Sequence, residues 1–283
     1  MAPDSRGPDT RAAARDAAAA SNGSGSQERA AAEPVVKEPL TEQQTAARRG
    51  LGDSAAEQEA RFGIALLHRH GWRLLLVFIG LLLPLWGFAE LADEIHEQEA
   101  IVFDEPVLQY AHSLARDGFD RLFVIVSQLG YLHGVVPFDI VLVIALTVRR
   151  RFREASFAAI ALAGSGLLNI AAKQFFARER PSLWESIAPE HNYSFPSGHA
   201  MGSMTLLVTL ALLSWPTRWR WPVLTVMAPF VLLVGFSRLY LGVHYPSDIL
   251  AGWAVATAWV VAVYLLVYRG GGLSPWRRAS AAD

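Results

Sequence analysis

Five stretches of the chain run for about 16–20 residues without a charged side chain, and this feature constrains the fold more than any other. They are residues 74–89, 155–172, 200–217, 221–237 and 249–268. An α-helix needs about 20 apolar residues to cross the ~30 Å hydrocarbon layer of a bilayer, so each stretch is close to one crossing. We therefore expect five transmembrane helices here, with buried helices of a soluble all-α protein as the alternative.

A sixth apolar stretch lies within residues 122–148, which is too long for one simple span and contains Asp139. We expect the crossing near 133–148. The predicted fold class is therefore all-α: a polytopic membrane protein with six transmembrane helices in the bilayer. Gly164 and Gly166 in the third span predict close helix packing. An intramembrane carboxylate is a candidate for function, but we interpret Asp139 as packed against another helix or placed near an interface.

Composition excludes some classes of site and partner. Of the 283 residues, 52% are hydrophobic, and the formal net charge of -1 argues against a general polyanion-binding surface, so no nucleic-acid partner is expected. The absence of cysteine excludes disulfides and thiolate metal sites. The first apolar run begins near residue 72, too late for a cleavable signal peptide, so we expect the first span to remain as an anchor.

Polar segments flank the apolar region. Residues 1–60 are rich in small and charged residues and are expected to form a disordered tail, because they cannot bury enough apolar surface to offset chain entropy. Residues 61–270 are expected to form the six-span domain, and residues 271–283 a short second tail. Arginines gather before the first span, between the second and third, between the fourth and fifth, and after the sixth. These four groups fall on one side, which should be cytoplasmic, so both tails are predicted to be cytoplasmic.

The segment 93–120 on the opposite side is mainly acidic. Phe103, Val107, Tyr110 and Leu114 recur in it at helical spacing, which predicts a short helix lying at the membrane surface.

Three polar clusters stand at span ends on the extracytoplasmic side. Lys173, Arg180 and Arg238 supply three cations, two of them guanidinium groups that match tetrahedral oxyanions. Ser197 and Gly198 precede His199 where the fourth span begins, so backbone N–H groups there can point at an anion with the helix dipole behind them. Together these groups predict a pocket for a phosphate-like ligand.

Two histidines provide a reaction for that pocket. His244 and Asp248 are four residues apart, with Pro246 suited to the first turn of the sixth helix. A carboxylate at this distance can hold one imidazole nitrogen and leave the other free to attack phosphorus. His199 could protonate the departing alkoxide and then activate water. This scheme needs no metal and no cofactor.

Each cluster also has a simpler interpretation. Lysines and arginines at span ends often only extend to the interface, and Arg178 is left without a role on that basis. A histidine near a helix start is commonly structural, and P-S-G-H is a weak signal by itself. Four residues could instead bind a metal, although the nearby cations would oppose a divalent ion. They are His191, His199, His244 and Asp248.

Three motifs carry a family resemblance. Lys173 to Pro181 reads K-x6-R-P, Pro196 to His199 reads P-S-G-H, and Ser237 to Asp248 reads S-R-x5-H-x3-D. Over residues 72–268 the chain resembles the type 2 phosphatidic acid phosphatase (PAP2) family, with all three motifs complete and in order. The resemblance implies a six-helix membrane fold with a metal-independent phosphatase site on the extracytoplasmic face.

The resemblance also implies residue roles. His244 would form a phosphohistidine intermediate with Asp248 as its partner, and His199 would be the acid/base. The remaining motif residues would bind the substrate phosphate: Lys173, Arg180, Ser197, Gly198 and Arg238.

We expect hydrolysis of a lipid phosphate or lipid pyrophosphate, such as phosphatidic acid, phosphatidylglycerol phosphate or undecaprenyl pyrophosphate, in a prokaryotic plasma membrane. The lipid tails would enter laterally between helices, a route that bulky substitutions between the third and fourth spans would test. A lipid phosphotransferase using the same phosphohistidine is the main alternative. Vanadium-dependent haloperoxidation is less favoured because those related enzymes are soluble. A lipid transporter is also less favoured because transporters usually place polar groups near the bilayer midplane.

Overall fold

The computed structural model describes residue 71 and residues 73–269, and this part of the chain is helical without strands, as predicted. The tails predicted at residues 1–60 and 271–283 lie outside the described residues. In chain order the elements are a π-helical segment η1 (Phe78–Leu82), α2 (Leu83–His96), α3 (Asp104–Ser113), α4 (Asp117–Leu129), α5 (Val135–Val148), α6 (Phe152–Phe176), α7 (Gly198–Ser214), α8 (Arg220–Tyr240) and α9 (Pro246–Val267).

Four helices in the described part are long and apolar enough to cross a membrane. They are Arg73–His96, which contains η1 and α2, and α6, α8 and α9. The shorter apolar helices α5 and α7 lie where the other two spans were predicted. With 17 residues, α7 rises about 25 Å, a little less than the hydrocarbon thickness. Four predicted spans thus meet the length criterion, and the total of six remains a prediction.

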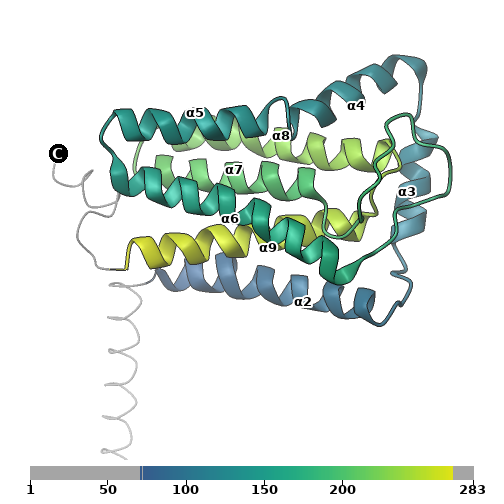
Figure 1. Cartoon of the computed structure of the whole chain (residues 1–283), viewed down its shortest axis with the longest axis horizontal. Helices are drawn as coiled ribbons and strands as arrows, with labels where there is room; N and C mark the ends of the chain where they lie inside the picture. The colour runs from purple at the N-terminus through teal and green to yellow at the C-terminus, as the bar shows by residue number, and fades with distance from the viewer. Residues whose placement is uncertain (1–70, 72, 270–283) are drawn as a thin grey trace, which may run out of the picture. The chain divides into compact units, whose positions relative to one another are not determined.

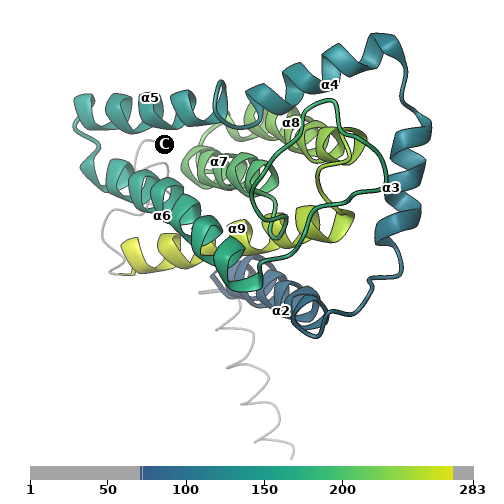
Figure 2. The same cartoon turned by 45° about the vertical axis from the view of Figure 1, so that its right-hand side comes forward.

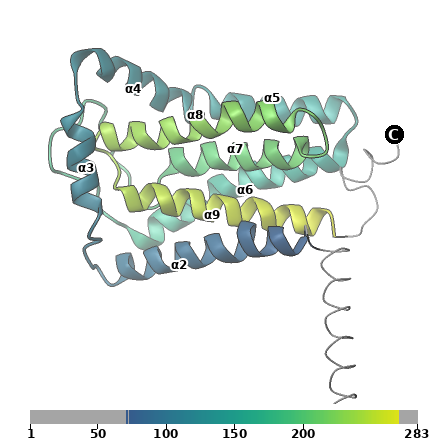
Figure 3. The ribbon, with the colours of Figure 1, turned by 180° about the vertical axis from the view of Figure 1, so that it is seen from behind.

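Helix α7 lies within the bundle and packs against α5, α6, α8 and α9 (Figures 1 and 3). Part of the core is a buried cluster in which Phe157 of α6 meets Leu212 of α7 and Tyr264 of α9. Gly164 permits the close approach of α6 to α9, because a Cβ atom there would lie 2.3 Å from Cζ2 of Trp259. The predicted packing role is confirmed for Gly164, but it is wrong for Gly166, which faces open space.

The predicted short helix between the first two spans is present as α3. It lies across one end of the bundle and packs against α8 and α9 (Figure 2). Val107 and Tyr110 on α3 are exposed, while Asp104, its first residue, is buried.

Loops 177–197 and 241–245 meet at the same end of the bundle as α3 (Figure 1). The N–H of Ser197, just before α7, donates to the main-chain oxygen of Asp248 in α9 at 3.0 Å, which joins the starts of these two helices. All three predicted polar clusters are therefore carried by neighbouring helix ends.

Helix α6 ends in a left-handed turn at Ala177 (φ 46°, ψ 32°), which redirects the chain toward this end of the bundle. Such a conformation costs a residue with a Cβ about 1–2 kcal/mol. We expect Ala177→Gly to raise the free energy of unfolding by about 0.5–1 kcal/mol, seen as a higher thermal unfolding midpoint in detergent. Ala171→Gly, inside α6, is the control and should lower stability by about 1 kcal/mol. A lower midpoint for Ala177→Gly would contradict this account.

Candidate active site

The start of α9 positions the predicted nucleophile. Asp248 is the third residue of the helix, and its Oδ2 accepts the N–H of Tyr245 at 2.8 Å. The same oxygen lies 3.3 Å from Nδ1 of His244. Asp248 therefore caps the helix and orients the imidazole at once. Both side chains are buried, with exposed fractions of 1% for His244 and 0% for Asp248.

The partners of His244 determine its tautomer. Nδ1 faces a carboxylate, which only accepts, while Nε2 lies 3.1 Å from Nη1 of Arg180, which only donates. Nδ1 therefore carries the proton and Nε2 presents its lone pair. Burial, followed by the charges of Arg180, Arg238 and Lys173, holds the pKa of His244 well below 6.5. The imidazole is thus neutral at pH 7, the form in which it can act as a nucleophile.

Two motif arginines converge on one carboxylate next to this imidazole. Nη2 of Arg180 donates to Oε2 of Glu190 at 2.6 Å, and Nη2 of Arg238 donates to Oε1. Burial raises the pKa of Glu190, but Arg238 and Arg180 outweigh burial and bring the pKa below 4.5. Nδ1 of His199 lies 3.9 Å from Oε1. A carboxylate anion therefore occupies the space between Arg180, Arg238 and His199.

The remaining motif residues adjoin this group. Nζ of Lys173 donates to the main-chain oxygen of Tyr193, which also accepts from Arg180 at 3.4 Å. Oγ of Ser197 accepts the N–H of Ala200 at 3.5 Å and so caps α7. Because the N–H of Ser197 is bonded to Asp248, the N–H groups of Gly198 and His199 remain the available donors at the helix start. The structure thus brings the motif residues to one place.

Sequence reasoning missed several residues of the site. Arg178, left without a role, forms ion pairs with Asp248 at 2.6 Å and with Asp104 at 2.8 Å. Ser194 donates its hydroxyl to Oδ2 of Asp248, and Glu190 lies between the arginines. Arg178 stands two residues before Arg180, which is a weak signal. No spacing rule points to Glu190 or Asp104.

The alternative metal site is not assembled in the part of the chain that the structure describes. There, no group of three or more His, Asp or Glu side chains is placed to hold a metal ion. His244 and His199 instead face arginines and Glu190.

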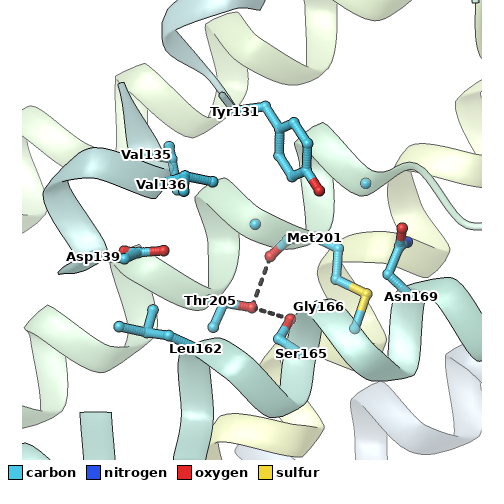
Figure 4. Close-up of a pocket in the computed structure, with 12 residues that line it drawn as sticks. Tyr131, Val135, Val136, Asp139, Leu162, Ser165, Gly166, Asn169, Met201 and Thr205 are labelled. Carbon is cyan, nitrogen blue, oxygen red and sulfur yellow. Dashed lines mark hydrogen bonds between the residues drawn. The ribbon is translucent and has the colours of Figure 1, made fainter. Parts of the chain in front are cut away.

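A cavity of about 100 Å³ adjoins the start of α7 (Figure 4). It is lined by α5, α6 and α7, and Tyr131, whose ring centroid lies 5.1 Å from that of His199, stands at its edge. Oγ of Ser165 and Oγ1 of Thr205 lie 2.7 Å apart in its wall. Asp139 also lines the cavity, and its buried Oδ1 has no hydrogen-bond partner among the described residues. The cavity therefore extends along α5, α6 and α7 and reaches Gly198 at the start of α7.

Residues 154–271, which contain all three motifs, match the model of the PAP2 superfamily. Over this part of its length, the chain is similar to the PAP2 superfamily. A relative, phosphatidylglycerophosphatase B of Bacillus subtilis, is 25% identical over 173 residues, which are 59% of this chain and 85% of the relative. An undecaprenyl-diphosphatase of Sulfolobus acidocaldarius is 44% identical over 69 residues, 24% of this chain and 31% of that protein.

The PAP2 fold is also found by structural comparison. A crystal structure of a transmembrane PAP2-type phosphatidylglycerolphosphate phosphatase from Bacillus subtilis matches with a TM-score of 0.59 and 23% identity, over 66% of this chain and 95% of that one. At this identity the likeness concerns the fold alone. The predicted resemblance and the enzyme class, a PAP2-type phosphatase, are confirmed by the family match and the named relatives.

Proposed function

We propose that the protein hydrolyses a lipid phosphate or lipid pyrophosphate through a phosphohistidine at His244. One observation supports this most strongly: Arg180 and Arg238 hold an oxyanion, the carboxylate of Glu190, beside Nε2 of a buried imidazole. A phosphoryl group needs the same charge complementarity and would displace Glu190 from the arginines. His199, 3.9 Å from that carboxylate, would then adjoin the phosphate.

The reaction takes two steps. Nε2 of His244 attacks phosphorus, the bond to the leaving oxygen breaks, and His199 gives a proton to that oxygen. His199 then takes a proton from water as the water oxygen attacks phosphorus, and the P–N bond breaks with its electron pair returning to Nε2. The products are inorganic phosphate and the lipid alcohol, or the lipid monophosphate when the substrate is a pyrophosphate. The guanidinium groups of Arg180 and Arg238 stabilise charge on the phosphoryl oxygens.

The relatives and the position of the site support the proposed substrate class. One relative is named phosphatidylglycerophosphatase, and others are named undecaprenyl-diphosphatase, from Sulfolobus acidocaldarius and, putatively, Escherichia coli. Their substrates carry a terminal phosphate on a lipid. In this chain the motif residues stand at the ends of apolar helices, where a headgroup would lie in a bilayer. Phosphatidic acid, phosphatidylglycerol phosphate and undecaprenyl pyrophosphate are therefore the substrates to compare.

The placement in the membrane is part of the proposal. Six crossings, made by Arg73–His96 and α5 to α9, put the four arginine groups on the cytoplasmic side. The active site then faces the extracytoplasmic side of the plasma membrane, and both termini are cytoplasmic.

Phosphate release by detergent-purified protein, with EDTA present, tests the proposal. The lipid panel would contain the three substrates above, and we expect release from at least one of them. A glycerol or lipid acceptor is added in a second series, because transfer of phosphate to the acceptor without release would identify a phosphotransferase. No release and no transfer by folded protein would overturn the proposal and favour transport.

The cavity beside Gly198 is the proposed place for the first part of the lipid chain, between α6 and α7. Gly166 lines it, and a Cβ atom at this position would meet no atom within 4 Å. We expect Gly166→Phe to reduce release from a long-chain lipid by roughly 10-fold or more, while release from a short-chain phosphate changes little. Gly87→Phe is the matched control, since Gly87 also faces open space but lies on α2, away from the cavity. Equal activity of Gly166→Phe on both substrates would contradict this placement.

A further inference from the structure

Arg178 connects the carboxylate of Asp248 to a second buried carboxylate on another helix. Its Nη1 donates to Oδ1 of Asp248 at 2.6 Å, and its Nη2 donates to Oδ2 of Asp104 at 2.8 Å. The guanidinium carbon lies 4.2 Å from the ring centroid of Tyr245. Both ends and one face of the guanidinium are therefore held, which restricts its orientation.

Asp104 is fixed in turn by α9. Its Oδ1 accepts the N–H of Ser247 at 2.9 Å, and its Oδ2 accepts the hydroxyl of Ser247 at 2.6 Å. The exposed side-chain fractions are 4% for Asp104 and 16% for Arg178. A pair this buried contributes little net stability, because desolvation offsets most of the attraction. The Arg178–Asp104 pair therefore affects the geometry of the site more than the stability of the fold.

The geometry of Asp248 divides its contacts between its two oxygens. Oδ2 is used by His244, Ser194 and the N–H of Tyr245, whereas Oδ1 accepts from Arg178. Without Arg178, Oδ1 loses its guanidinium partner, and the carboxylate is held through Oδ2 and is freer to rotate. Rotation would move Oδ2 away from Nδ1 of His244 and release the imidazole from its orientation.

We propose that Arg178 and Asp104 are positioning residues that fix Asp248 and, through it, the attacking Nε2 of His244; this inference rests on the proposed function. Neither side chain contacts the oxyanion position. Helix α3 thereby supports the active site from outside the three motifs. A second contact also joins α3 to the site: the ring of His112 stacks on that of Trp184 in loop 177–197, with the two ring centroids 3.9 Å apart.

Kinetic measurements can separate the positioning role of Arg178 from the binding of phosphate by Arg180 and Arg238. We expect Arg178→Met and Asp104→Asn to lower kcat on the order of 10–100-fold, as occurs when a partner that orients a functional histidine is removed. Inhibition by inorganic phosphate should change by less than about threefold, because Arg180 and Arg238 still bind the anion. Arg178→Lys keeps a charge but cannot bridge two carboxylates in one plane, so its kcat should be intermediate.

Arg121→Met is the control, because Arg121 is an exposed arginine, and it should retain the parent kcat. If Arg178→Met and Asp104→Asn keep kcat within threefold, the positioning role is wrong. A parallel loss of kcat and of phosphate inhibition would also overturn it, because the pair would then maintain the pocket itself. Should Arg178→Met not fold, Arg178→Lys and Asp104→Asn decide the question. A parent protein that releases no phosphate would instead contradict the proposed function.

Discussion

His244→Asn is expected to abolish phosphate release, with kcat falling on the order of 10⁴-fold or more, as when other enzymes lose a nucleophile. In the parent protein Nε2 presents its lone pair while Nδ1 is held by Asp248. Asparagine is shorter and has no nucleophilic nitrogen, so no covalent intermediate can form. The measurement is phosphate release under single-turnover conditions, combined with trapping of labelled protein. A phosphohistidine is stable in alkali and labile in acid, which distinguishes it from a phosphoserine.

The corresponding His199 variant provides the matched comparison. His199 is proposed to protonate the leaving oxygen, a contribution of about 10²–10⁴-fold that depends on how poor the leaving group is. With p-nitrophenyl phosphate, whose leaving group needs no proton, labelling of His199→Asn should approach that of the parent, while His244→Asn remains unlabelled. Label on His244→Asn would overturn the assignment of the nucleophile. An equal loss of labelling by His199→Asn with both leaving groups would contradict the general-acid role.

Much of this site follows from sequence because its parts lie at helix ends. The apolar stretches define where helices begin and end, and charged residues at those ends must lie near the bilayer surface. His244 and Asp248 are four residues apart, so their contact is local and depends little on the rest of the fold. The same reasoning predicts that Ser197 and Gly198 open a helix, as they do in α7.

The missed residues depend on contacts between distant segments. Arg178 reaches Asp248 because Ala177 turns left-handed at the end of α6, a conformation that alanine rarely adopts. Asp104 is far from all three motifs in sequence and reaches them because α3 lies across the bundle end. Glu190 stands in loop 177–197, which has no regular periodicity from which a direction could be read. For Gly166 the sequence predicts a helix contact that the structure does not have. A glycine beside a cavity and a glycine in a helix contact look the same in the sequence.

Glu190→Gln is expected to strengthen the binding of inorganic phosphate on the order of 10-fold. Arg180 and Arg238 hold the Glu190 carboxylate, so an incoming phosphate must displace it. Hydrogen bonds to charged groups contribute roughly 1.5–3 kcal/mol, and the neutral amide competes less well for the two guanidinium groups. The measurement is the inhibition constant of inorganic phosphate against lipid hydrolysis, checked by direct binding. Glu185→Gln, an exposed position in the same loop, is the control and should leave the constant unchanged.

Although Glu190→Gln should strengthen phosphate binding, it should lower the stability of the folded protein. Without Glu190, the charges of Arg180 and Arg238 lose their counter-charge, and we expect a loss of about 1–3 kcal/mol, less than for a fully buried pair because 26% of the Glu190 side chain is exposed. Phosphate binding to the folded state should restore this loss, so the unfolding midpoint of Glu190→Gln should rise more steeply with phosphate than that of the parent. Weaker phosphate binding by Glu190→Gln would show that Glu190 takes part in holding the ligand. Tighter binding with lower unliganded stability is the result that identifies Glu190 as an internal competitor for the phosphate site.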